Sequence, residues 1–300
     1  MAHIPVLQKE VLEYLDPKPN ENFIDCTIGE GGHSLAILEK TAPEGKVLGI
    51  DWNDEIIQNT KYKFQNAEYK NRVILVCDNF VNLKEIVKKQ KFKKISGILF
   101  DLGMSSWHLE GSERGFSFLK KEPLDMRYNP QNPTSAEKIL NYWSREEIEK
   151  ILREFGEERF SKEISEKIIE TRKIEPIKNT FQLTEIIRRA VSDRYLNQRI
   201  NPATRTFQAL RIAVNNELNN LEESLPQALE VLERDGRIAI ISFQSLEDRI
   251  VKFFFKNQMQ EGQIKILTKK PVVPAGNEVK INPRSRSAKL RAAVKICQIL

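Results

Sequence analysis

Short apolar runs alternate with longer amphipathic segments through residues 1–101. Four apolar runs predict β-strands, at residues 23–26, 46–51, 72–77 and 96–101. Two of the intervening segments, residues 34–40 and 55–64, have the pattern of amphipathic helices. Strands and helices that alternate at this pitch are typical of a parallel sheet with helices on both faces. We therefore expect an α/β fold.

The pattern changes after about residue 109. Residues 111–133 are punctuated by Gly and Pro and predict loops, whereas residues 135–191 have helical periodicity almost without strand signals. Ser144 and Glu147 have the spacing of a capping box, which predicts that a helix begins there. This part of the chain therefore reads as an all-helical domain.

The sheet resumes after the helical stretch. Residues 202–233 predict helices, 237–243 a strand, 246–256 a helix and 290–300 a final strand. The predicted organisation is one discontinuous domain, residues 1–109 and 202–300, with residues 110–201 inserted as a helical domain. The chain of 300 residues at 34.8 kDa is long enough for both to have a core.

Composition excludes several classes of protein. No apolar run approaches the roughly 18 residues of a membrane span, and the start lacks the pattern of a secretory signal, so we expect a cytoplasmic chain without membrane contact. Cys26, Cys77 and Cys297 include no CxxC pair, and the chain has only three His, so neither a disulfide framework nor a metal site is expected.

A glycine-rich segment follows the first predicted strand: Asp25-Cys-Thr-Ile-Gly-Glu-Gly-Gly-His33. Glycines at the carboxyl end of a strand let the backbone approach a ligand closely, where open α/β sheets bind their ligands. The dinucleotide fingerprint GxGxxG would need a third glycine at Ser34, which weakens a nicotinamide cofactor as the ligand. A turn used only for chain reversal is the alternative.

Acidic residues end the later strands. Asp51 ends the second strand, where a carboxylate can accept hydrogen bonds from both ribose hydroxyls of a nucleoside cofactor, although it could instead cap the next helix. Phe80 follows the third strand and offers an aromatic face to an adenine ring, or else belongs to the core. Asp101 ends the fourth strand, where an acceptor could hold an exocyclic amine. Together these residues favour a nucleoside-binding α/β enzyme.

The net charge of +6 is concentrated at the C-terminus. Only Glu278 opposes nine cations between Lys265 and Leu300, a local balance of 9 − 1 = +8: Lys265, Lys269, Lys270, Lys280, Arg284, Arg286, Lys289, Arg291 and Lys295. Such a segment suits phosphate contacts about as well as it suits a solvated basic face.

Ordered sequence blocks run through nearly the whole chain: His-Ile-Pro-Val-Leu at 3–7, Asp-x-Thr-x-Gly-x-Gly-Gly-His at 25–33, Asp-Leu-Gly-x-Ser-Ser at 101–106, Arg-Gly-Phe-Ser-Phe at 114–118, Pro-Leu-Asp-Met-Arg at 123–127, Gly-Glu-Glu-Arg at 156–159, Pro-Ala-Thr-Arg-Thr-Phe-Gln-Ala-Leu-Arg-Ile at 202–212, Ser-Leu-Glu-Asp-Arg at 245–249 and Asn-Pro-Arg-Ser-Arg-Ser-Ala at 282–288. Read together, they closely resemble the MraW family, the bacterial ribosomal RNA small-subunit methyltransferase H family.

The resemblance implies a class I, Rossmann-like methyltransferase fold with an inserted helical domain that helps shape the RNA site. It implies methyl transfer from S-adenosyl-L-methionine to the exocyclic N4 amine of a cytidine in small-subunit (16S) ribosomal RNA, near the decoding centre. The acceptor would be that RNA or the assembled small subunit, and a homodimer stays open.

The resemblance also implies site residues. Matching positions suggest cofactor contacts at Gly31, Gly32, His33, Asp51, Phe80, Asp101 and His108. The catalytic loop would contain Asp101, Ser105 and Ser106, and the RNA backbone would be held by Arg205, Arg284 and Arg286, with Phe207 and Trp107 as stacking surfaces or, for Phe207, as core. The chain departs from the family at His108, Asn201 and Gln244, where the family usually has Gln, His and His. A proton-transfer role at the last two is thereby in doubt.

The expected reaction is a direct displacement in which the cytosine amine attacks the methyl group, so Cys26 and Cys77 are not expected to act as nucleophiles. Three alternatives remain. The chain could methylate another nucleic-acid amine, in DNA or a different RNA. It could be an NAD-dependent oxidoreductase, which shares the sheet and the glycine turn. It could also be a non-enzymatic RNA-binding protein, although two aspartates at strand ends argue against this.

Overall fold

A computed structural model describes residues 4–65, 69–196 and 201–296. His3 and Cys297, which the sequence analysis singled out, lie outside these residues. The chain divides into two compact units. The first, here called the sheet unit, comprises Met1–Gly103 and Leu218–Leu300, and the second, the helical unit, comprises Met104–Glu217.

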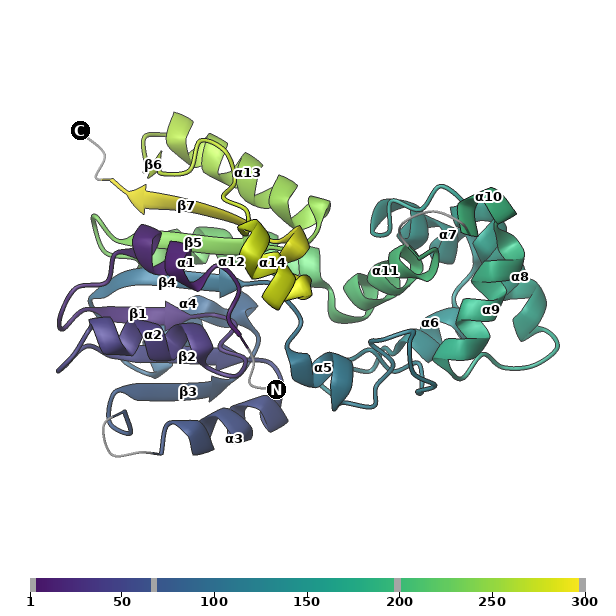
Figure 1. The fold of residues 1–300 in the computed structure, drawn as a ribbon, viewed down its shortest axis with the longest axis horizontal. Helices are drawn as coiled ribbons and strands as arrows, with labels where there is room; N and C mark the ends of the chain where they lie inside the picture. The colour runs from purple at the N-terminus through teal and green to yellow at the C-terminus, as the bar shows by residue number, and fades with distance from the viewer. Residues whose placement is uncertain (1–3, 66–68, 197–200, 297–300) are drawn as a thin grey trace. The chain divides into compact units, whose positions relative to one another are not determined.

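The sheet unit is built on a seven-stranded sheet with the order β3-β2-β1-β4-β5-β7-β6 (Figure 1). The strands are β1 (Asn22–Asp25), β2 (Val47–Asp51), β3 (Val73–Cys77), β4 (Ile95–Asp101), β5 (Arg237–Ser242), β6 (Ile264–Ile266) and β7 (Lys289–Lys295). The neighbours from β3 to β5 pair in parallel, which confirms the predicted strands and the α/β class. Strand order reverses direction between β1 and β4, and such a switch point is where open α/β sheets form a ligand crevice.

The far side of the sheet is antiparallel, a direction that the sequence pattern of residues 1–101 did not indicate. β7 pairs antiparallel with both β5 and β6. The helix between β5 and β6 returns the chain so that β6 runs in the direction of β5, and β7 then turns back between them. An antiparallel strand needs no crossover helix, so the alternation of strands and helices that predicts parallel pairing does not extend to β7.

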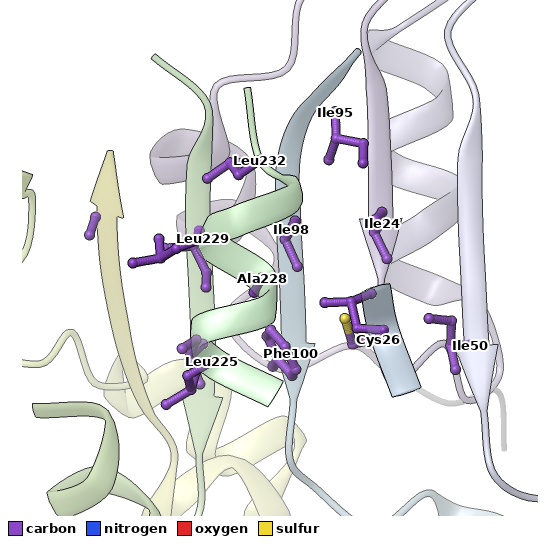
Figure 2. Close-up of a cluster of buried hydrophobic side chains, with 14 of the residues drawn as sticks. Ile24, Cys26, Ile50, Ile95, Ile98, Phe100, Leu225, Ala228, Leu229 and Leu232 are labelled. Atoms are coloured by element: carbon purple, nitrogen blue, oxygen red, sulfur yellow. The ribbon is translucent and has the colours of Figure 1, made fainter. Parts of the chain in front are cut away.

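Helices cover both faces of the sheet (Figure 1). One face packs against α1 (Gln8–Leu15), α2 (Gly32–Lys40) and α3 (Asp54–Lys63). The other packs against α4 (Leu83–Lys89), α12 (Glu217–Val231) and α13 (Ser245–Gln260). Figure 2 shows this second core, with Leu225, Ala228 and Leu229 of α12 beside Ile98 and Phe100 of β4. The remaining elements are the short helices η1 (Phe80–Asn82), α14 (Gly276–Ile281) and η2 (Pro283–Ser287).

The helical unit has its own apolar core. Its helices are α5 (Ser106–Glu110), α6 (Ala136–Tyr142), α7 (Arg145–Glu154), α8 (Ser161–Arg172), α9 (Thr180–Ala190), α10 (Asp193–Leu196) and α11 (Ala203–Asn215). The predicted capping box at Ser144 and Glu147 is present at the start of α7, with both of its hydrogen bonds formed. No helix among the residues described is long and apolar enough to cross a membrane.

The helical unit is longer at both ends than the predicted residues 110–201. α11 lies in it because Ala203, Phe207, Leu210 and Val214 are buried in the helical core. At the other end, Met104 and Leu109 pack against the same core. The sequence pattern placed the boundary where strand signals stop, whereas the packing of apolar side chains places it at residues 104 and 217.

Candidate active site on the sheet unit

Carboxylates stand at the carboxyl ends of three adjacent parallel strands. Asp25 ends β1, Asp51 ends β2 and Asp101 ends β4. Because β1 lies between β2 and β4, the three side chains lie together at the carboxyl ends of neighbouring strands, beside the switch point. Asp51 and Asp101 thus lie at the strand ends where the sequence predicts them, together with Asp25, and their roles stay predictions.

The glycine-rich loop between β1 and α2 is fixed by packing within the protein. Gly31 has φ +78°, and a Cβ there would lie 2.7 Å from the Phe64 ring. A Cβ on Gly32 would lie 2.3 Å from Cγ of Pro5. Glycine is therefore needed at both positions to seat the loop and α2, a reason that the sequence analysis did not foresee. Their contact with a cofactor stays a prediction.

Asp51 is held by backbone donors. Its Oδ1 accepts a hydrogen bond of 2.9 Å from the Asn53 amide, and its Oδ2 accepts one of 3.2 Å from the Gly29 amide. Burial is the main cause that raises the pKa of Asp51 to about 6, against the effect of these hydrogen bonds. Asn53, not Asp51, caps α3, since its side chain accepts from Glu55 and Ile56. Asp51 therefore is not the helix cap that the alternative required.

Asp25 ties the end of β1 to the start of α2. It is fully buried, its Oδ2 accepts a hydrogen bond of 2.7 Å from the Ser34 hydroxyl, and its Oδ1 accepts from the Thr27 amide. Burial raises the pKa of Asp25 above its ordinary value. Ser34, which stands where the dinucleotide fingerprint would have its third glycine, therefore has a structural role as a hydrogen-bond donor to Asp25.

Asp101 and His33 face each other at these same carboxyl strand ends. His33 Nε2 lies 3.6 Å from Asp101 Oδ2, and the two side chains are 7% and 17% exposed. Both ring nitrogens of His33 are buried without a hydrogen-bond partner among the residues that the structure describes. The Asp101 amide donates to Thr27 Oγ1 over 2.6 Å. Thr27 was missed as a positioning residue, although its place in the Asp-x-Thr motif was visible.

Phe80 opens η1 just after β3. Its ring meets Phe100 edge to face, with centroids 5.6 Å apart, and it packs against the core while staying partly exposed. Asp78 Oδ1 accepts from the Asn79 amide and from Asn82 Nδ2, which fixes the turn before it. The core alternative for Phe80 is thus supported, and the adenine contact stays a prediction.

Ser105 and His108 lie together in the helical unit. Ser105 is the N-cap of α5, and its Oγ is 2.9 Å from His108 Nδ1. The His108 ring is buried among Trp107, Phe116 and Tyr128. Burial, with the charges of Arg114 and Arg211, lowers the pKa of His108 to about 3, so the imidazole is neutral at pH 7. The side chain of Ser106 lies outside what the structure describes.

The depressed pKa of His108 predicts a pH-dependent stability. The unfolded chain binds the proton near pH 6.5 and the folded chain only near 3, so stability is lost as the pH falls from 6.5 towards 3. The loss is about 1.4 kcal/mol per pH unit, or about 2 kcal/mol between pH 7 and 5. Urea unfolding, followed by tryptophan fluorescence, gives the free energy of unfolding at pH 7 and pH 5. The decrease between these two pH values should be about 2 kcal/mol smaller in His108→Gln than in the wild type. An unchanged pH dependence in that variant would contradict the assignment.

The predicted RNA-binding residues differ in their surroundings. Arg205 Nη1 donates to the Glu157 carbonyl over 2.8 Å. Phe207 is 5% exposed and packs against Phe118, so its role as a stacking surface is wrong and the core alternative is confirmed. Trp107 lies under the Arg114 guanidinium, 5.3 Å from ring centroid to Cζ.

The basic C-terminal segment has both structural and exposed cations. Lys289 and Arg291 of β7 pair with Asp248, at 3.4 and 2.7 Å. Although burial opposes ionisation, these two cations lower the pKa of Asp248. Arg284 and Arg286 lie exposed on η2. The basic segment therefore contains cations with an internal ion-pairing role as well as exposed ones, and phosphate contacts by the exposed ones stay a prediction.

The N-terminal block packs against this exposed segment. Glu278 Oε1 accepts a hydrogen bond of 2.8 Å from the Leu7 amide, and Asn282 Nδ2 donates to the Ile4 carbonyl over 3.1 Å. Two of the sequence blocks, 3–7 and 282–288, thus have residues side by side in the sheet unit.

The two described cysteines are poor nucleophiles. Cys26 is buried among Ile24, Ile50 and Phe100 (Figure 2), and burial raises its pKa well above the ordinary value. Cys77 is exposed at the end of β3, the edge strand. Its pKa is also raised, by partial burial and by nearby carboxylates.

We expect Cys77→Ser to leave methyl transfer and stability unchanged. Cys26→Ser should keep its kcat but lose about 1–3 kcal/mol of stability, because a hydroxyl replaces a thiol in an apolar core. Steady-state kinetics and thermal unfolding of both variants check this. Loss of turnover in a folded Cys26→Ser protein would instead indicate a covalent intermediate.

Comparison with known proteins agrees with these observations. The sequence model of the MraW methylase family matches residues 1–296. Ribosomal RNA small subunit methyltransferase H of Heliobacterium mobile is 46% identical over 310 residues, covering 98% of this chain and 99% of that protein. The protein of the same name from Clostridium botulinum strain Kyoto is 43% identical over 309 residues, with 98% and 99% covered.

A solved structure, that of an rRNA methylase from Streptococcus thermophilus, is similar with a TM-score of 0.46 and 12% identity over 99% of this chain and all of that one. The family match spans both units and both parts of the sheet unit. The sheet unit of this chain, with parallel strands from β3 to β5 and an antiparallel β7, has a class I, Rossmann-like methyltransferase fold. The chain therefore belongs to the MraW methylase family.

Proposed function

We propose that the chain transfers a methyl group from S-adenosyl-L-methionine to the exocyclic N4 amine of a cytidine in small-subunit ribosomal RNA, near the decoding centre. Membership of a methylase family and relatives named for small-subunit ribosomal RNA support the reaction and the acceptor. The observation that carries the choice of an amine is Asp101, a carboxylate at the end of β4 whose oxygens face the site edge beside His33.

The residues at the strand ends fit the cofactor. Asp51 offers lone pairs beyond those that the Gly29 and Asn53 amides use, as ribose hydroxyls require. Asn53 Nδ2 and both His33 ring nitrogens are buried polar atoms without hydrogen-bond partners in the described residues, which is costly unless a ligand meets them. We assign Gly31, Gly32, His33, Asp51, Phe80, Asp101 and His108 as cofactor contacts.

Asp101 would hold and orient the amine. When bound, S-adenosyl-L-methionine supplies an electrophilic methyl group on a sulfonium. The lone pair of the cytosine amine is delocalised into the ring, so an acceptor that takes an N–H hydrogen bond and the developing positive charge favours the reactive, pyramidal form. Asp101 has that chemistry, and Ser105 and Ser106 continue its loop. The raised pKa values of Cys26 and Cys77 support direct displacement over covalent catalysis.

The RNA backbone would be held by Arg205, Arg284 and Arg286. Arginine suits phosphate because its planar guanidinium donates two parallel hydrogen bonds. The target base must leave its stack to reach a strand-end crevice, either by flipping or because the RNA is already open there. A DNA amine as acceptor stays the nearest alternative, and an oxidoreductase is disfavoured by membership of a methylase family.

The choice of acceptor can be tested by methyl incorporation. Purified protein and labelled S-adenosyl-L-methionine are incubated with small subunits that lack the modification, with protein-free small-subunit RNA, with large subunits and with DNA. We expect incorporation only into small subunits or their RNA. Labelling of DNA at a comparable rate would overturn the proposed acceptor, and reduction of a nicotinamide cofactor without methyl transfer would overturn the reaction.

A further inference from the structure

The block Gly156-Glu-Glu-Arg159 joins α7 to α8, and its first residues fix the loop. A Cβ on Gly156 would lie 2.6 Å from the Leu152 carbonyl oxygen and 2.8 Å from that of Arg205. The Glu157 carbonyl accepts the hydrogen bond from Arg205 Nη1. The loop is thereby held against the first turns of α11, and the proposed function uses none of its four residues.

Glu158 supports a pair of aromatic rings. It is 2% exposed, its Oε1 accepts from the Phe160 amide over 2.9 Å, and its Oε2 accepts from the Tyr195 hydroxyl over 2.7 Å. The two rings meet edge to face with centroids 4.7 Å apart. Burial and Glu158 raise the pKa of Tyr195 to about 12, so its phenol stays a donor at neutral pH. A buried carboxylate thus fixes a rigid aromatic platform, which we define as Phe160 and Tyr195.

Arg159 lies on this platform. Its Cζ is 4.8 Å from the Phe160 centroid and 5.7 Å from the Tyr195 centroid, while the residue is exposed. Arg205 is held nearby, because its Nη1 donates to the carbonyl of Glu157, two residues before Arg159, and its charge also acts on the Tyr195 phenol. A guanidinium stacked on rings keeps its in-plane N–H donors available and loses little freedom when it binds.

Four exposed or half-buried arginines of the helical unit differ from these two, because they are ion-paired. Arg145, Arg153, Arg188 and Arg189 each form ion pairs with glutamates of their own or a neighbouring helix. Within the residues described, neither Arg159 nor Arg205 forms an ion pair with a carboxylate. The protein therefore orders two cations through ring and carbonyl contacts rather than through ion pairs, an arrangement suited to an anion from outside.

We propose that Arg159 and Arg205 form a phosphodiester-binding site that holds the backbone of the RNA substrate, with Arg159 as a contact that the family resemblance did not indicate. This rests on the proposed function, because the anion is the RNA acceptor. Phosphate contacts of this kind supply affinity and position without reading sequence. Loss of such a contact should raise the KM for RNA and weaken the salt dependence of RNA binding, while binding of the cofactor is unchanged.

The test compares Arg159→Ala, Arg159→Lys and the control Arg153→Ala, an exposed and ion-paired position on α7. KM for small-subunit RNA, kcat and the affinity for S-adenosyl-L-methionine are measured at several salt concentrations. We expect Arg159→Ala to raise KM for RNA about tenfold and to lower the slope of log affinity against log salt by about 0.7–0.9. Arg159→Lys should recover part of the affinity, and Arg153→Ala should match the wild type.

Two outcomes separate this inference from the function on which it rests. If the wild type transfers methyl groups to small-subunit RNA but Arg159→Ala has an unchanged KM and salt slope, the phosphate site alone is overturned. A wild-type protein that transfers no methyl group to this RNA overturns the proposed function, and the phosphate site with it.

Discussion

Asp101→Ala is expected to lower kcat for methyl transfer by about 100-fold or more. The carboxylate is 17% exposed and lies 3.6 Å from His33 Nε2, and from the residues described it accepts only a long hydrogen bond of 3.4 Å, from the Gly103 amide. Its oxygens therefore keep acceptor capacity for an amine N–H. Without them, the delocalised lone pair of the cytosine amine has no partner that favours its reactive form.

The comparison of variants separates charge from shape. Asp101→Asn keeps an acceptor oxygen but cannot stabilise positive charge, so its kcat should fall nearly as far as that of the Ala variant. Asp235→Asn, in the exposed turn before β5, removes the same charge from the sheet unit and should keep full activity. A kcat for Asp101→Ala within about threefold of the wild type would remove Asp101 from the mechanism.

Asp51→Ala is expected to weaken S-adenosyl-L-methionine binding by about 10- to 100-fold. A hydrogen bond to a charged acceptor is worth about 1.5–3 kcal/mol, and the ribose of the cofactor would lose its acceptor. The same substitution removes the acceptor of the Gly29 amide and loosens the glycine-rich loop, which should weaken cofactor binding further. Isothermal titration of the cofactor measures the effect, and Asp54→Asn, an exposed first-turn residue of α3, is the matched control.

The pKa of Asp51 adds a pH test of the same contact. Because burial raises this pKa to about 6, the carboxylate is ionised at pH 7 and gains a proton as the pH falls through 6. If the ionised form binds the ribose, affinity for the cofactor should fall about tenfold between pH 7 and 5. Asp51→Asn should lack this pH dependence, and an equal fall in that variant would place the titrating group elsewhere.

The parts of the fold that follow from local pattern could be predicted from the sequence. The four N-terminal strands, the capping box at Ser144 and the strand ends at Asp51 and Asp101 all depend on short-range periodicity and on the geometry of parallel sheets. The family resemblance added the cofactor and the acceptor, which spacing alone could not supply.

Features that depend on long-range packing were not predictable. The antiparallel β7 is set by its pairing with β5 and β6, and the domain boundary is set by the burial of α11 in the helical core. Phe207 has the same residue type whether it stacks on a base or fills a core, and only the contact with Phe118 decides between them. Arg159 could not be singled out for a similar reason, because its platform joins residues from α10 and the loop before α8.

The most direct test of the central claim is the identity of the modified nucleoside. Small subunits lacking the modification are incubated with labelled S-adenosyl-L-methionine and either wild-type protein or Asp101→Ala, and the RNA is digested for mass spectrometry. We predict cytidine methylated on its exocyclic N4 amine with the wild type and its loss with Asp101→Ala. Label on carbon five, on a ribose hydroxyl or on another base would contradict the account.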